Sequence, residues 1–266
     1  MIGNAGTRFY DIEPVGAKAR IRHLMYLLRA RAGISSGSGR RRVTDFLSEV
    51  GREDLLSLFP PESRSLATQS QGAIRILDAL ASEQGKTTWV EKSPDHLAYI
   101  DEIARYVRPT RFIHILRNGP DNIASIYDAA QKYPDTHWNF YWGTLDRCVN
   151  QWKHSIRLTQ KYRGHPNHLT VIYEELVNDP QTTLTRICEF MGLEYEETMV
   201  DNYRDTAKGI VLEKSAWKSG VFGSIRTDTS KFDIFTDVQK DYILSQLNEL
   251  SSDVALSPLC VVNKHG

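Results

Sequence analysis

Residues 111–125 read RFIHILRNGPDNIAS, and this stretch decides the fold class. Its first half is a short apolar run of β-branched and aromatic residues, which predicts a buried strand. Pro120 suits the first turn of a following helix, because its missing N–H would be unsatisfied there in any residue. We therefore expect Arg117 at the carboxyl end of a strand and Ser125 in the first two turns of the next helix. Ligands of open parallel sheets bind at that edge, and a helix N-terminus there suits phosphate.

Two more segments, 87–91 and 168–173, have the composition of strands, and helical patterns separate all three. Strands that are joined through helices pair in parallel with right-handed crossovers. The sequence thus predicts an α/β fold with a three-layer parallel sheet flanked by helices, in a single domain over residues 1–266. Helices are expected over 17–31, 43–50, 52–58, 65–84, 140–162 and 180–191, and again from 237.

Several of these helices carry signals at their ends. Asp179 and Pro180 are typical of a helix start, and Gly192 is typical of its end. Thr236 followed by Gln239 matches a capping box. These signals fix the bounds of two helices in the second half of the chain.

The composition excludes several classes of protein. The chain has 266 residues, with 33 Lys and Arg against 33 Asp and Glu. It therefore lacks the excess of basic residues that is typical of a protein that binds nucleic acid. Cys148, Cys188 and Cys260 form no metal or disulfide pattern, which favours a reducing compartment. The sequence has no apolar run long enough for a membrane span and no signal-peptide core. We expect a cytoplasmic protein that binds no metal.

A second cationic side chain is expected at a comparable corner. Lys92 follows the predicted strand 87–91, and Ser93 resembles the N-cap of a helix that begins at Pro94. Lys92 and Arg117 would then converge on one anionic ligand, although a surface lysine beside a cap explains Lys92 as well. His96 lies one turn into the same helix, where it could act as an acid or base or could be a structural histidine.

These residues together resemble the sulfotransferase family. In that family a strand-end Arg and a Ser eight residues later hold the 3′-phosphate of 3′-phosphoadenosine 5′-phosphosulfate (PAPS), and Arg117 and Ser125 match them. Glu91-Lys92-Ser93-Pro94 resembles the family's Glu-Lys-Ser/Thr segment, whose Lys stabilises the oxygen that leaves the sulfuryl group. Residues 173–177, YEELV, look like a segment whose Tyr packs near the adenine, so Tyr173 is a nucleotide-binding candidate. A strand-end Tyr packed on the core is the equal alternative.

The resemblance extends to the C-terminal part of the chain. Ser215 and Lys231 match a loop that closes over the nucleotide and excludes water, which would compete for the sulfuryl group. The resemblance implies a P-loop-NTPase-like fold, PAPS or its product PAP as the nucleotide, and no metal. It leaves the acceptor open between a small molecule, a carbohydrate and a peptide, and it does not decide the oligomeric state.

The match covers about residues 85–250 and departs from the family at two places. No segment resembles the Pro-Arg-Ser-Gly-Thr-Thr loop that wraps the 5′-phosphosulfate. Residues 6–10, GTRFY, look like the segment that often carries the catalytic-base Glu, but Gly6 stands in place of the Glu. We therefore expect the chain as given to have little activity and marginal solubility, because a strand and its phosphate loop would be missing.

Three functions follow from these observations. The first is sulfuryl transfer from PAPS to a hydroxyl or amine. The second is a non-catalytic sulfotransferase-like protein that binds PAP or a protein partner, which the missing loop and Gly6 favour. The third, a nucleotide kinase, is opposed by the absence from the sequence of a Gly-x-x-x-x-Gly-Lys-Ser/Thr loop and of an acidic pair for magnesium.

Overall fold

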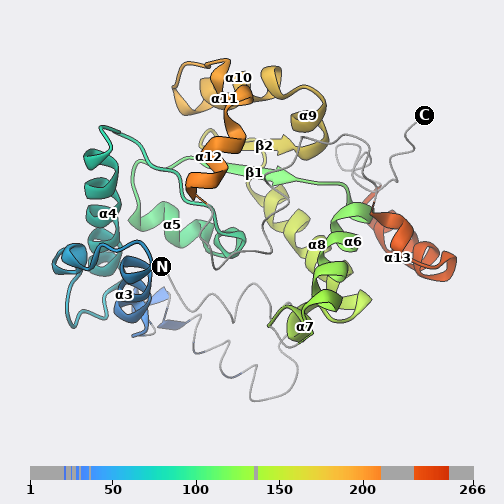
Figure 1. Cartoon of the computed structure of the whole chain (residues 1–266). Helices are drawn as coiled ribbons and strands as arrows, with labels where there is room; N and C mark the ends of the chain where they lie inside the picture. Colours follow the sequence, from blue (N-terminus) through green and yellow to red (C-terminus); the bar gives the residue numbers. More distant parts are fainter. Residues whose placement is uncertain are drawn as a thin grey trace. The chain divides into compact units, whose positions relative to one another are not determined.

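The computed structural model describes residues 31–35, 37–134, 137–210 and 231–251, together with the helical positions 21, 25, 28 and 29 (Figure 1). Contacts divide the chain into two compact units, residues 1–110 and 111–266. The predictions for Ser215, Cys260 and the segment 6–10 lie outside the described residues, as does most of the predicted helix 17–31.

The first unit is built from helices. They are α3 (Gly39–Glu49), the 3-10 helix η1 (Glu53–Leu58), α4 (Leu66–Glu83), the 3-10 helix η2 (Pro94–Tyr99) and α5 (Ile100–Tyr106). The predicted helix 65–84 is confirmed as α4, where the Ser65 hydroxyl accepts the N–H of Thr68 and Gly85 follows with a φ of 66°. The core of this unit packs α3, η1 and α4 through Val43, Leu47, Leu55, Phe59, Ala73 and Ile76.

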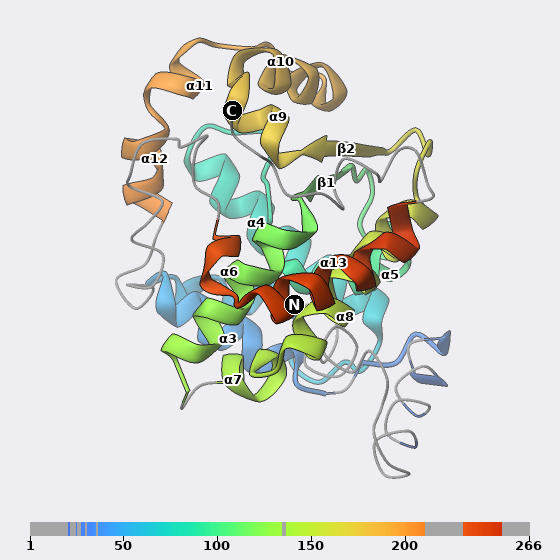
Figure 2. The same ribbon diagram turned by 90° about the vertical axis from the view of Figure 1, so that its right-hand side faces the viewer.

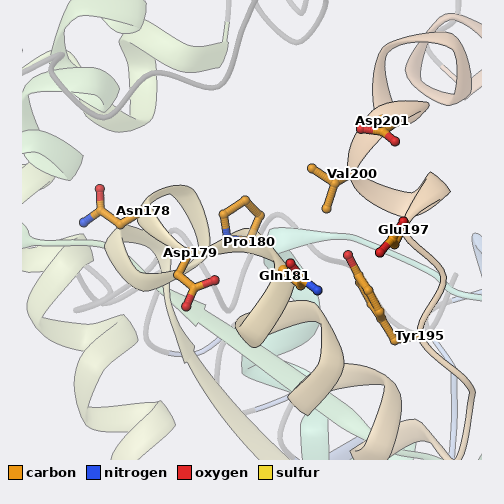
Figure 3. A pocket seen from close by; sticks show the side chains of 8 residues that line it. All are labelled: Asn178, Asp179, Pro180, Gln181, Tyr195, Glu197, Val200 and Asp201. Atoms are coloured by element: carbon orange, nitrogen blue, oxygen red, sulfur yellow. The ribbon is translucent and has the colours of Figure 1, made fainter.

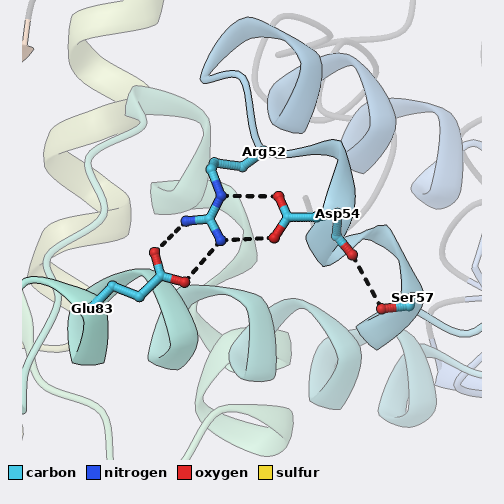
Figure 4. Close-up of polar contacts among 4 residues, drawn as sticks. All are labelled: Arg52, Asp54, Ser57 and Glu83. Atoms are coloured by element: carbon cyan, nitrogen blue, oxygen red, sulfur yellow. Dashed lines mark hydrogen bonds and ion pairs between the residues drawn. The ribbon is translucent and has the colours of Figure 1, made fainter.

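A half-buried arginine joins the start of η1 to the end of α4 (Figure 4). Arg52 donates to both carboxylate oxygens of Asp54, at 2.9 and 2.8 Å, and to the carboxylate of Glu83 at 2.8 Å. Hydrogen bonds from the guanidinium lower the pKa of Asp54 and of Glu83. Because the two carboxylates are solvent-exposed, the pairs orient the helix ends more than they stabilise the fold.

The predicted strand 87–91 is wrong. Residues 86–93 form neither a helix nor a strand, and the Val90 side chain is 82% exposed. The Trp89 indole N–H instead donates to Asp78 of α4 at 2.9 Å. A β-rich composition describes a surface that fits a pleated sheet, and none of the described strands pairs with this segment. Lys92 therefore precedes η2 from an irregular segment, and Ser93 makes no side-chain cap bond.

The second unit contains a parallel pair of strands, as the sequence predicts. β1 (Phe112–Leu116) pairs with β2 (His168–Ile172) in the register Phe112↔His168 to Leu116↔Ile172 (Figure 1). Helices α6 (Gly119–Lys132), α7 (His137–Trp142) and α8 (Leu145–Lys161) lie between them in the sequence. The single predicted helix 140–162 is wrong, because Gly143 and the extended Thr144 separate α7 from α8.

The remaining elements follow β2 along the chain. They are α9 (Tyr173–Asn178), α10 (Pro180–Met191), α11 (Thr198–Asp201), α12 (Tyr203–Ile210), the 3-10 helix η4 (Phe232–Ile234) and α13 (Asp237–Ser251). The predicted caps are confirmed: Asp179 accepts the N–H of Thr182 at 3.1 Å, and Gly192 ends α10 with a φ of 72°. The Gln239 side chain likewise accepts the N–H of Thr236 at 3.0 Å. Among the described residues, no helix is both long and apolar enough to cross a membrane.

Helices α6, α8 and α13 contact one another and bury the apolar core of the second unit (Figure 2). This core is formed by Ile123, Ala124, Val149, Trp152, Ile156, Ile243 and Leu247. Gly119, the first residue of α6, allows the closest approach. A Cβ at Gly119 would lie 2.6 Å from Leu247 Cδ1 and 3.2 Å from Trp152 Cζ2. This packing fixes where α6 begins, and hence where β1 ends.

Histidines and aromatic rings stack on one side of the strand pair. His114 is 7% exposed, and its Nε2 lies 2.9 Å from Nδ1 of His168. The His168 ring stacks between Phe112 and Tyr162, with ring centroids at 4.7 and 4.8 Å. Burial, with a smaller contribution from the charge of His168, lowers the pKa of His114 to about 4. His114 is therefore neutral in the folded protein at neutral pH.

The Gly119 contact predicts a measurable loss of stability. Gly119→Ala should lower the free energy of unfolding by about 1–3 kcal/mol, because an added methyl group overpacks a filled core. Urea denaturation measures this loss. In a Leu247→Ala background the overlap is relieved, so Gly119→Ala should cost less there. Equal costs in the two backgrounds would show that the close approach does not govern the site.

The His114 environment predicts a pH dependence. The pKa of His114 is lower in the folded chain than its ordinary value of 6.5, so between about pH 6.5 and 4 the unfolded chain binds more protons. The contribution to stability is complete above pH 6.5 and is lost as the pH falls toward 4. One proton gives a slope of at most about 1.4 kcal/mol per pH unit. His114→Gln should flatten the stability profile in this window, whereas exposed His165→Gln should not; an unchanged slope in His114→Gln would contradict the assignment.

Candidate functional site

Two of the predicted nucleotide-binding residues are neighbours in the structure. β1 and β2 end together, with Leu116 opposite Ile172, so Arg117 and Tyr173 leave the sheet at the same edge. The guanidinium carbon of Arg117 lies 5.0 Å from the centre of the Tyr173 ring. Such stacking holds an arginine side chain in place while its N–H groups stay available to a ligand.

The environment of Arg117 lacks an acceptor for one of its donors. The Trp152 indole N–H donates to the Arg117 carbonyl at 3.1 Å, which fixes the backbone. The side-chain Nε is buried and has no hydrogen-bond partner among the described residues. A buried charged donor without an acceptor is unfavourable, so an anion that reached it would relieve that cost. Arg117 therefore has the surroundings of an anion-binding side chain.

The N-terminus of α6 is capped by the protein itself. The Asn118 side chain accepts the N–H of Asp121 at 2.9 Å, and the Asn118 carbonyl accepts the N–H of Asn122 at 3.1 Å. Asp121 also places a carboxylate in the first helical turn, where it complements the helix dipole. The N–H groups of Asp121 and Asn122 are therefore occupied by acceptors of the chain itself, and the expected phosphate contact at this helix N-terminus stays a prediction.

Ser125 and Lys231 are both associated with α6. Ser125 is half-buried in the second turn of the helix. Lys231 precedes η4, and its Nζ lies 3.5 Å from the carboxylate of Asp128, which also binds Lys132 at 2.8 Å. The hydrogen bond from Lys132 is the main reason why the pKa of Asp128 is lowered. The structure thus brings the segment at Lys231 to the helix that carries Ser125, and the nucleotide contacts of both residues stay predictions.

Lys92 and His96 belong to the unit 1–110. Lys92 is exposed. Nδ1 of His96 lies 2.6 Å from the carboxylate of Glu91. A carboxylate at one ring nitrogen holds the imidazole in one orientation. The sequence did not predict this pair, although both residues stand in the segment that was singled out.

A sequence model described as the sulfotransferase family matches residues 12–197, more than half of the chain. The chain belongs to this family. Among curated proteins, Sulfotransferase 1C2 of Rattus norvegicus is 28% identical over 112 residues, which are 40% of this chain and 36% of that protein. The chain therefore matches little more than a third of the length of that relative.

Two solved sulfotransferase domains are similar in structure. The domain from the curacin biosynthetic pathway has a TM-score of 0.47 and 15% identity, and the match covers 79% of this chain and 76% of that one. The domain from the Synechococcus PCC 7002 olefin synthase has a TM-score of 0.47 and 18% identity, with 91% and 90% covered.

A hollow in the second unit is lined by residues other than those predicted for this family (Figure 3). Its volume is about 380 Å³, and its lining includes the carboxylates of Asp179, Glu197 and Asp201 and the ring of Tyr195. Burial, with help from Glu197 and Asp201, raises the pKa of Tyr195. Because three acidic side chains repel phosphate, this hollow is unsuited to an anionic nucleotide. Within the part of the chain that the structure describes, no group of three or more His, Cys, Asp or Glu is placed to hold a metal ion.

Sequence reasoning missed the polar residues behind Arg117. Asn118, Asp121 and Glu174 are joined by hydrogen bonds, among them that from the Asn118 amide to Glu174 at 2.6 Å. A signal for the first two was present, since Asn at one position and Asp three residues later is a capping pattern. Glu174 had no such signal, because its partner lies 56 residues away in the sequence.

Proposed function

We propose that this chain binds PAPS and moves its sulfuryl group to a hydroxyl or amine acceptor. The observation that carries the proposal is the Arg117 guanidinium stacked on Tyr173, with a buried Nε that lacks an acceptor among the described residues. It lies at the carboxyl edge of a parallel strand pair, where ligands of such sheets bind. Membership of the sulfotransferase family supports sulfuryl transfer as the reaction.

In the proposed reaction the bond from sulfur to the bridging oxygen breaks, a bond from sulfur to the acceptor forms, and the acceptor proton passes to a base. PAPS supplies the activated sulfuryl group. Arg117 and Ser125 are assigned to the 3′-phosphate, Tyr173 to the adenine side, and Ser215 and Lys231 to the closing loop. These assignments rest on the family resemblance of the motifs.

The chemical step is assigned to the first unit. Lys92 is proposed to stabilise the negative charge that grows on the bridging oxygen, an interaction that is stronger in the transition state than in the ground state. His96 is proposed as the acid or base. The Glu91 carboxylate at 2.6 Å supports this role, since a partner at one ring nitrogen orients the imidazole.

The proposed function also implies a domain architecture and a cellular compartment. We propose a three-layer, P-loop-NTPase-like sulfotransferase domain that spans residues 1–266. The buried free thiols of Cys148 and Cys188 support a reducing, cytoplasmic setting. The acceptor is a small molecule, a carbohydrate or a peptide.

Calorimetry with PAP, ATP and AMP, together with a transfer assay that uses labelled PAPS, tests this function. Preferential binding of PAP and transfer of the label support it. Binding of PAP without transfer to any acceptor supports the non-catalytic alternative. Tighter binding of ATP than of PAP would overturn both, because the 3′-phosphate would then contribute nothing.

The anion role of Arg117 predicts a loss that is specific for the 3′-phosphate. A charge-assisted hydrogen bond contributes roughly 1.5–3 kcal/mol, so Arg117→Ala should weaken PAP binding by at least about tenfold. Binding of AMP, which has no 3′-phosphate, should barely change. Arg111→Ala is the matched control, because Arg111 flanks the opposite end of β1 and donates to the Met191 carbonyl at 3.1 Å. Equal losses for PAP and AMP in Arg117→Ala would place its effect elsewhere.

The role of Lys92 predicts a loss of turnover without a loss of binding. Lys92→Ala should lower kcat by about a hundredfold or more and leave PAP affinity nearly intact, because its contact forms mainly in the transition state. Steady-state kinetics and calorimetry separate the two effects. Lys86→Ala, in the same exposed segment, should behave like the parent chain. His96→Gln should be the milder change; normal turnover in Lys92→Ala would remove the assignment.

A further inference from the structure

A chain of hydrogen bonds lies directly behind Arg117. Asn118 is 2% exposed and Asp121 is 6% exposed. The Asn118 backbone N–H donates to Oε1 of Glu174 at 3.0 Å, and its side-chain amide donates to the same oxygen at 2.6 Å. That amide also donates to Oδ2 of Asp121 at 3.0 Å, while Asn118 Oδ1 accepts the N–H of Asp121 at 2.9 Å. We call Glu174, Asn118 and Asp121 the clasp.

The clasp holds the backbone on the C-terminal side of Arg117. Glu174 comes from the first turn of α9, immediately after β2, and Asn118 caps α6 just after β1. The Arg117 carbonyl is bound by Trp152, and the next backbone N–H is bound by Glu174. The direction in which the Arg117 side chain leaves the sheet therefore depends on Glu174. No ion pair joins the two side chains, so the link runs through the backbone of Asn118.

The clasp also reaches a segment far along the chain. Oδ1 of Asp121 accepts the backbone N–H of Lys231 at 2.9 Å, across 110 positions of sequence. One carboxylate thus uses its two oxygens for two different segments, Asn118 and Lys231. Because the Asp121 carboxylate binds both Asn118 and Lys231, a movement of one of these residues changes the position of the acceptor that the other one contacts.

The charge of Glu174 does not explain its position. One carboxylate oxygen is fully used, whereas Oε2 is buried and has no hydrogen-bond partner among the described residues. A negative charge beside an anion-binding arginine opposes the binding of phosphate. Glu174 therefore acts in the site as a hydrogen-bond acceptor at a fixed position. A neutral side chain with an acceptor at the same position would serve equally well.

We propose that Glu174 is the positioning residue for Arg117, and that Asn118 and Asp121 couple this position to the seating of the segment at Lys231. For the nucleotide, this inference rests on the proposed function. For the ligand-free protein it stands alone. The clasp then makes occupation of the Arg117 site and docking of the Lys231 segment mutually favourable.

The first arm of the test needs no nucleotide and measures residue-resolved hydrogen exchange in the full chain. Glu174→Ala should speed exchange of the Asn118 amide by about tenfold, because that amide loses its acceptor. Asp121→Ala should speed exchange of the Lys231 amide, while Asp128→Ala should not, because Asp128 contacts the side chain of Lys231 and not its backbone N–H. Glu175→Ala is the matched control for Glu174, since exposed Glu175 pairs with Arg186 at 3.4 Å on the surface. Unchanged Asn118 exchange in Glu174→Ala overturns the proposal whether or not PAP binds.

The second arm measures PAP and AMP affinities of the same variants. Glu174→Ala should weaken PAP binding by about tenfold and leave AMP binding nearly unchanged, as misplacement of one charge-assisted contact requires. Glu174→Gln, which keeps the acceptor and removes the charge, should bind PAP at least as tightly as the parent chain. A loss in Glu174→Gln as large as in Glu174→Ala would make charge, not position, the role of Glu174. If the parent chain shows no preference for PAP, the proposed function fails, while the exchange arm still decides the clasp.

Discussion

The parallel register between β1 and β2 is the constraint on which the candidate site depends. Because Leu116 pairs with Ile172, the two strands end at the same level and release Arg117 and Tyr173 side by side. A shift of one residue in this register would turn each side chain to the opposite face of the sheet. The register is fixed in turn by buried side chains on the strands, among them His114 and Val171. The packing of the two strands thus brings Arg117 onto the ring of Tyr173.

The edge of the sheet is polar, and the cost of burying those groups is met in different ways at different residues. Asn118 and Asp121 satisfy each other and also close the end of α6. Arg117 Nε and Glu174 Oε2 are the atoms at this edge that remain without a hydrogen-bond partner among the described residues. Unsatisfied buried polar atoms are uncommon in folded proteins, and they concentrate where a ligand or a water completes the network. Their presence behind a family-matched arginine gives the site a physical basis beyond the motif.

The helices that cover this edge are organised for close approach. Gly119 lets α6 begin against Trp152 of α8 and Leu247 of α13. Trp152 both fills this contact and donates to the Arg117 carbonyl, so one side chain links the core to the site. Burial of such large apolar groups provides most of the stability of a domain. The position of Arg117 is therefore tied to the same packing that folds the second unit.

The sequence by itself determined features that depend on neighbouring residues. The strand 112–116, the cap at Asp179, the glycine at 192 and the box at Thr236 follow from local periodicity and side-chain geometry, and the structure contains each of them. Strand formation at 87–91 was predicted wrongly, since a strand also needs a partner that composition cannot supply. Only the tertiary structure placed Glu174 against Asn118, Asp121 against Lys231 and Arg117 over Tyr173. These contacts join residues 56 to 110 positions apart, and their geometry depends on register and helix packing, which no local pattern encodes.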